Sequence, residues 1–144
     1  ADAMIGRPVD PVTERTRTVV GAAYSAFASH DIPALLALLS PEVEWGEPEN
    51  PLIPSSGMRH GTAGVMDWLK VGNETEDIRA FDLHRLLVDG DMAAAIGRTR
   101  IVARPTGKVY EMDFVHLVTV KDGAIVRFVE SFDTWLAAEA FRST

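Results

Sequence analysis

Tight turns between long alternating runs of residues dominate the second half of the chain. The turns are Asp89-Gly90-Asp91, Pro105-Thr106-Gly107 and Lys121-Asp122-Gly123. Asp-Gly or Thr-Gly between two alternating runs is a strong signal of a β-hairpin. The sequence therefore predicts strands over residues 78–88, 92–103, 108–120 and 124–132, which pair in order as an antiparallel meander.

Helical patterns open the first half. A first helix is predicted to begin at Thr13 and to end at His30–Asp31. Asp31 caps a short second helix over residues 32–39, which Ser40–Pro41 ends. The first helix buries one face, because apolar residues recur in it every three or four positions: Val19, Val20, Ala23, Tyr24, Phe27 and Ala28.

A strand, a loop and a third helix are predicted before the meander. The strand covers residues 43–47, and the proline-rich loop 48–54 follows it. Thr62 caps the third helix, which Gly72 and Asn73 stop.

The order of the predicted elements sets the fold class. A closing helix over residues 134–141, capped by Asp133, completes the order helix, helix, strand, helix, four long strands and helix. This order is α+β, with the helices covering one face of a curved sheet whose closed side is a natural apolar pocket. Residues 1–12, with two prolines, are predicted to be an irregular lead-in, and residues 13–144 to form a single domain.

Composition excludes several classes of protein. The 144 residues make one ordinary domain, and the net charge of −7 argues against binding to nucleic acid or to an anionic membrane. The absence of cysteine excludes a disulfide scaffold and a thiol nucleophile. A chain without cysteine fits a reducing cytosol, so we expect a cytoplasmic protein, and no apolar run approaches the length that spans a bilayer. The histidines lack metal-ligand spacing and no phosphate-binding glycine loop occurs, so neither a metal nor a cofactor is predicted.

Three stretches of the chain are similar to a known superfamily. They are residues 19–48, which include HDIPALLALLSPEVEWGEP, then MRHGTAGVMDWL at 58–69, and GRTRIVARPTGKVYEMDFVHLVTVKDGAIVRFVESFDTW at 97–135. In order and spacing they resemble the nuclear transport factor 2-like superfamily, and within it the SnoaL-like and ketosteroid isomerase-like enzymes. The resemblance implies a cone-shaped, curved antiparallel sheet with helices packed on its concave side, the cystatin-like arrangement. Isomerases, cyclases, dehydratases, epoxide hydrolases and non-catalytic binders share this fold, so the fold alone does not identify a reaction.

Alternation along the strands shows which side chains share a face. The resemblance implies that four such sets face one cavity. The first set is Trp45 and Glu47, and the second is Met112, Phe114, His116 and Val118. The third is Phe128, Glu130 and Phe132, and the fourth is Arg98, Arg100 and Val102.

Glu47 is the candidate general base. Its segment, read from His30 to Pro48, resembles the ketosteroid isomerase segment that ends in the catalytic carboxylate followed by proline. A carboxylate at the mouth of an apolar cavity has a raised pKa and can carry a proton to and from carbon. The alternative is a solvated carboxylate beside the proline-rich loop.

His116 is the candidate donor to the substrate oxygen. The resemblance places it where the isomerase has a protonated acid, and an imidazole could stabilise an oxyanion there. The isomerase's oxyanion tyrosine would fall at Ala23, whereas Tyr24 lies about 100° further around the helix. Tyr24 therefore either enters the pocket from a shifted helix or belongs to the core.

Arg98, Arg100 and Glu130 suggest a different reaction. Their stretches look like those in which limonene-type epoxide hydrolases carry an Asp–Arg–Asp arrangement that activates water. Glu130 stands at one acid position and Arg98 at or near the arginine, but Arg100 occupies the other acid position. An Arg–Glu ion pair across adjacent strands is the simpler interpretation.

These observations predict a cofactor-independent enzyme that moves protons on a small hydrophobic carbonyl compound, as an isomerase, cyclase or dehydratase. A non-catalytic small-ligand-binding module and a limonene-type epoxide hydrolase are the alternatives. Apolar residues on both faces of the sheet, and the habit of the family, predict a homodimer. The candidate catalytic residues are Glu47 and His116, and the candidate substrate-binding residues are Trp45, Tyr24, Trp68, Met112, Phe114, Arg100 and Glu130.

Overall fold

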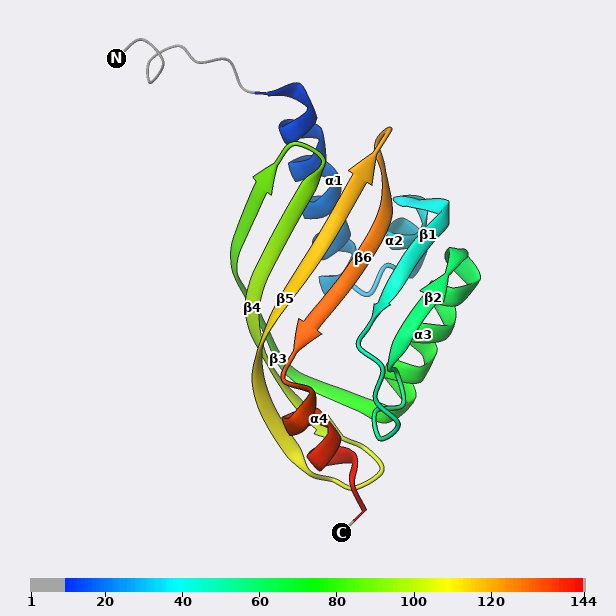
Figure 1. Cartoon of the computed structure of the whole chain (residues 1–144), viewed down its shortest axis with the longest axis vertical. Helices are drawn as coiled ribbons and strands as arrows, with labels where there is room; N and C mark the ends of the chain where they lie inside the picture. The colour runs from blue at the N-terminus through cyan, green and yellow to red at the C-terminus, as the bar shows by residue number, and fades with distance from the viewer. Residues whose placement is uncertain (1–9, 144) are drawn as a thin grey trace, which may run out of the picture.

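A computed structural model describes residues 10–143 and shows a curved, open sheet with four helices in this part of the chain (Figure 1). The elements follow the predicted order, with one short strand added. They are α1 (Pro11–Ala28), α2 (Ile32–Ala37), β1 (Leu39–Glu47), β2 (Gly57–His60), α3 (Gly61–Thr75), β3 (Glu76–Asp89), β4 (Met92–Ala103), β5 (Val109–Lys121), β6 (Ala124–Phe132) and α4 (Thr134–Phe141).

The sheet has the strand order β2-β1-β6-β5-β4-β3. The predicted antiparallel meander from β3 to β6 is confirmed. The sheet is nevertheless mixed, because β1 pairs with β6 in parallel. This pairing joins the first half of the chain to the meander, and it brings the carboxyl ends of β1 and β6 to the same edge.

The start of α1 corrects the predicted lead-in. The helix begins at Pro11, and the carboxylate of Asp10 caps it by accepting a hydrogen bond from the backbone N–H of Val12. Proline suits the first helical turn because its missing N–H has no partner there in any case. The lead-in prediction for residues 1–9 lies outside the described residues.

The second helix is shorter than predicted, since α2 ends at Ala37 and β1 already begins at Leu39. Leu39 pairs with Ile125 on β6 and lies in the core, so sheet pairing and burial prevail over helical spacing. The sequence also failed to indicate β2, whose four residues are too few for a visible alternation.

The predicted cap of the third helix is wrong. His60 precedes α3 without a side-chain cap, and the helix continues through Gly72 and Asn73 to Thr75. The predicted closing helix is confirmed, and Asp133 caps it by accepting a hydrogen bond from the N–H of Leu136.

The helices and the concave face of the sheet enclose the core. α1 packs on β3 to β6, and α3 packs on β1 and β2; Figure 1 shows α1 behind the long strands. One buried cluster lies between α1, α3 and the sheet, and a second lies beneath α4. In residues 10–143 no helix combines the length and the apolar character that crossing a membrane requires.

Candidate active site

A cavity lies on the concave side of the sheet, between α1, α3 and strands β1 and β3 to β6. Its empty space, including the part that opens to solvent, is about 970 Å³. Most of the wall is apolar and aromatic, and none of the lysines or arginines that the structure describes lines it. The ionisable side chains of the lining are Tyr24, Glu47, Glu76, Tyr110, His116 and Glu130.

Glu47 lies at the end of β1 and is only 4% exposed. The indole Nε1–H of Trp68 donates a hydrogen bond of 2.8 Å to its Oε1. Burial, and then the charge of Glu130, raise the pKa of Glu47 to about 7. Hydrogen bonds from Trp68 and Ser55 and the charge of Arg59 oppose this rise. The side chain is therefore a buried carboxyl that changes its protonation near neutral pH, as a general base requires.

The backbone around Glu47 depends on a glycine. A Cβ at Gly46 would lie 2.2 Å from the carbonyl oxygen of Gly57, so β1 and β2 can approach each other here only without a side chain. This close approach brings Ser55, which is 4% exposed, beside the carboxyl of Glu47.

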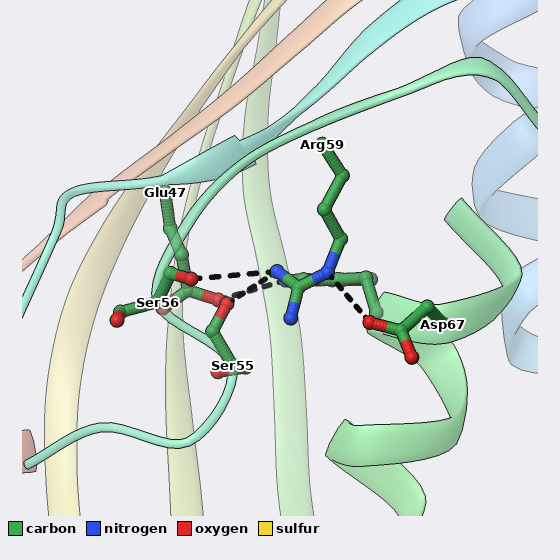
Figure 2. Close-up of polar contacts among 6 residues, drawn as sticks. Glu47, Ser55, Ser56, Arg59 and Asp67 are labelled. Atoms are coloured by element: carbon green, nitrogen blue, oxygen red, sulfur yellow. Dashed lines mark hydrogen bonds and ion pairs between the residues drawn. The ribbon is translucent and has the colours of Figure 1, made fainter. Parts of the chain in front are cut away.

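Arg59 holds the loop that carries Ser55 (Figure 2). Its Nη1 donates hydrogen bonds to the carbonyl oxygens of Ser55 at 2.8 Å and Ser56 at 3.5 Å. Its Nε bonds Asp67 on α3 at 3.1 Å, and the side chain is 16% exposed. Arg59 does not line the cavity, but it ties α3 to the loop beside Glu47 and supplies a nearby positive charge.

Replacing Arg59 with methionine should raise the pKa of Glu47 further above 7. The variant removes the charge that favours the carboxylate and the bonds that hold Ser55 in place. An NMR titration of the Glu47 carboxyl measures the shift directly. Arg79→Met, which removes an arginine paired with Asp77 at the surface, should leave the titration unchanged. An unaltered pKa in Arg59→Met would contradict this role.

Tyr24, His116 and Glu130 form a chain of hydrogen bonds. The hydroxyl of Tyr24 lies 2.6 Å from Nδ1 of His116, and Nε2 of His116 lies 2.6 Å from Oε2 of Glu130. Glu130 on β6 stands directly opposite His116 on β5. Burial, and then the charge of Glu130, raise the pKa of Tyr24, which keeps its hydroxyl protonated.

This chain changes the expected roles of its members. Tyr24 enters the cavity rather than serving only as core, because α1 turns it towards His116. Both ring nitrogens of His116 already have partners within the protein. An imidazole has only two nitrogens, so His116 in this arrangement has no donor left for a substrate.

No sequence pattern indicated a third acid in the cavity beside Glu47 and Glu130, and the structure places the half-buried Glu76 there. Glu76, the first residue of β3, accepts a hydrogen bond of 3.2 Å from the hydroxyl of Tyr110. Burial, then the charges of Glu130 and Glu47, raise the pKa of Glu76 to about 7, while the bond from Tyr110 opposes the rise. Glu76 follows the polar run Asn73-Glu74-Thr75, which looks like a surface turn. Tyr110 could have been found, because it alternates with Met112 and Phe114.

Arg98 and Arg100 lie outside the cavity, which corrects their predicted place and the substrate-binding role of Arg100. Arg98 bonds Asp113 at 3.0 Å, and Arg100 pairs with Glu111 at 3.6 Å, all on the outer face of the sheet. The alternation of β4 is offset by one from the expectation, since its cavity-facing residues are Thr99 and Ile101.

The same placement removes the basis for an epoxide hydrolase. Glu130 pairs with His116 and not with Arg98, so the described residues do not form the expected Asp–Arg–Asp arrangement. Within residues 10–143, no three histidine or acidic side chains are grouped so as to hold a metal ion. The other predicted lining residues, Trp45, Trp68, Met112 and Phe114, all face the cavity.

Comparisons with solved structures agree with this architecture. An NTF2-like protein from Burkholderia thailandensis is 29% identical, with a TM-score of 0.80 over 88% of this chain and 97% of its own. TerC, co-crystallised with polyporic acid, is 27% identical, with a TM-score of 0.77 over 88% and 98%. A candidate SnoaL-like polyketide cyclase from Mesorhizobium loti is 19% identical, with a TM-score of 0.68 over 80% and 97%.

Comparison at the level of sequence identifies the family. A search of curated proteins found no match. The sequence model of the SnoaL-like domain matches residues 20–128, which include the second half of α1, the Glu47 strand and most of the meander. The chain therefore belongs to the SnoaL-like domain family, on the nuclear transport factor 2-like fold.

Proposed function

We propose that the protein is a cofactor-independent enzyme that moves protons on a hydrophobic carbonyl compound, with Glu47 as the general base. The observation that carries the proposal is the buried carboxyl of Glu47, whose pKa is raised to about 7 inside an aromatic cavity. A base of this pKa is half ionised at neutral pH, so it can take a proton from carbon and return it.

The donor to the substrate oxygen is Tyr24 in this proposal, with His116 behind it. When the imidazole carries two protons, Nδ1–H donates to the oxygen of Tyr24 and Nε2–H donates to Glu130. The phenolic hydrogen of Tyr24 is then free to turn into the cavity, where it can bond an enolate oxygen. His116 thus acts through Tyr24 rather than on the substrate.

Several reactions share this chemistry. Removal of a proton alpha to a carbonyl begins isomerisation, intramolecular aldol cyclisation and dehydration alike. The comparison with the candidate polyketide cyclase and the co-crystal of TerC with polyporic acid support a flat, largely apolar substrate for this cavity. Stacked rings such as Phe81 on Phe114, 4.9 Å apart, provide walls for such a molecule.

A direct test is the isomerisation of a β,γ-unsaturated ketosteroid, followed by ultraviolet absorbance from pH 4 to 9. We expect turnover that rises through one apparent pKa near 7, as Glu47 loses its proton. Folded protein without turnover would contradict the isomerase, and turnover with no dependence on pH would contradict Glu47 as the base.

We also propose that the outer face of the sheet mediates self-association. Leu87, Met92 and Leu117 are 48%, 45% and 43% exposed and line one shallow hollow on β3, β4 and β5. Exposed apolar patches of this kind often mark interfaces.

Leu117→Glu should shift a homodimer to monomer, as measured by sedimentation velocity. The matched control is Leu136→Glu, which alters an exposed leucine on α4 and should leave the mass unchanged. A wild-type protein that sediments as a monomer would refute self-association.

A further inference from the structure

We propose that Glu76 and Tyr110 form a second recognition point in the cavity, which binds a hydroxyl group of the ligand. The inference rests on the proposed function in one respect, since it places the ligand in the same cavity as Glu47. It narrows the ligand to a largely apolar molecule with two separated polar groups.

The two side chains meet because β3 and β5 flank β4. Glu76 pairs with Ala103, and Tyr110 pairs with Ile101, on opposite edges of that strand. The hydroxyl of Tyr110 donates to Oε2 of Glu76 at 3.2 Å. In residues 10–143, Tyr110 is the one side chain that hydrogen bonds or ion-pairs with Glu76, so Oε1 is left for another donor.

An apolar stretch separates this pair from the Tyr24–His116–Glu130 chain. Tyr110 and His116 lie on the same face of β5, and between them on that face are Met112 and Phe114. A ligand that reaches both points therefore needs an apolar middle.

A purely structural role explains Glu76 poorly. Even partial burial of a carboxylate without a cation is costly, and no lysine or arginine of residues 10–143 lines this cavity. The charges of Glu130 and Glu47 add to the cost, as the raised pKa of Glu76 shows. A ligand hydroxyl would offset part of this cost, because a hydrogen bond to a charged acceptor is among the stronger kinds.

Two naphthols that differ in one substituent test the inference. Their affinities are measured by calorimetry at pH 8, where Glu76 is mostly ionised. 2,6-Dihydroxynaphthalene offers a second donor, whereas 6-methoxy-2-naphthol offers only an acceptor at that position. Wild-type protein should bind the diol about tenfold more tightly, as expected for one hydrogen bond to a charged group. Glu76→Met should abolish the preference, and Glu74→Met, an exposed neighbour on α3, should retain it.

Tyr110→Phe provides a second variant if Glu76→Met fails to fold. It removes the hydroxyl that orients Glu76 and should reduce the preference for the diol without changing the shape of the wall. The inference would be overturned if the wild type bound both naphthols equally or bound neither of them. It would also be overturned if the preference for the diol survived in Glu76→Met. Binding requires no turnover, so a diol preference in a protein without isomerase activity would refute the proposed function alone.

Discussion

Replacing Glu47 with glutamine should lower the rate of ketosteroid isomerisation by about a thousandfold, which lies within the usual contribution of a general base. Glutamine has nearly the same shape, and its amide oxygen can still accept the hydrogen bond from Trp68. The variant therefore removes proton transfer and little else. Steady-state kinetics across the pH range should show that the rise of the rate near pH 7 is absent from the residual activity of the variant.

The matched control is Glu49→Gln, two residues along the chain. Glu49 is exposed and lies outside the cavity lining, so its loss should leave the rate and the pH profile unchanged. A Glu47→Gln protein that keeps the wild-type rate would show that another group takes the proton.

The second large effect is on stability, and it needs no substrate. The pKa of Glu47 is about 7 in the folded protein and about 4.5 when unfolded, so between these values the folded state holds a proton that the unfolded state releases. The contribution of the Glu47 carboxyl to the free energy of unfolding must therefore fall as the pH rises from about 4.5 to about 7, and level off above pH 7. The full shift corresponds to about 3 kcal/mol.

Glu47→Gln should accordingly be more stable than the wild type at pH 8, by about 2 kcal/mol once the weaker hydrogen bonding of an amide is considered. The gain should shrink as the pH falls through 4.5, because only below this value does the carboxyl become neutral in both states. Urea unfolding at several pH values measures this difference. Glu49→Gln should follow the wild type at every pH. If the difference in free energy of unfolding between Glu47→Gln and the wild type were smaller at pH 8 than at pH 5, that result would contradict a buried charge at position 47.

Local sequence signals were sufficient to predict the meander and two of the three aspartate caps, those of α2 and α4. The turns at Gly90, Gly107 and Gly123 all have positive φ, a backbone conformation that glycine adopts without strain. Asp31 and Asp133 cap the helices as expected, because a cap depends on residues only three positions apart.

Features that depend on distant parts of the chain were not predicted. The parallel pairing of β1 with β6 and the position of Glu76 in the cavity wall arise from contacts that no local pattern records. The angle of about 100° around the helix between Ala23, the expected tyrosine position, and Tyr24 was also misleading. A phenol is long enough to reach His116 from its own position on α1.

The placement of Arg98 and Arg100 shows how one residue of offset reverses a prediction. Alternation correctly separated the two faces of β4, but it could not tell which face is inside. The structure puts Thr99 inside, and its hydroxyl donates to the backbone of Ala80 on β3. The arginines consequently pair with Glu111 and Asp113 on the outer face.

The most direct test of Glu47 as the general base is an NMR titration of its side-chain carboxyl, with Glu47→Gln used to assign the resonance. We predict a pKa of about 7, raised by burial and by Glu130. A value near 4.5, the ordinary value for a glutamate, would mean that Glu47 is a solvated carboxylate. That result would contradict the proposed base and leave a cavity that binds its ligand without acting on it.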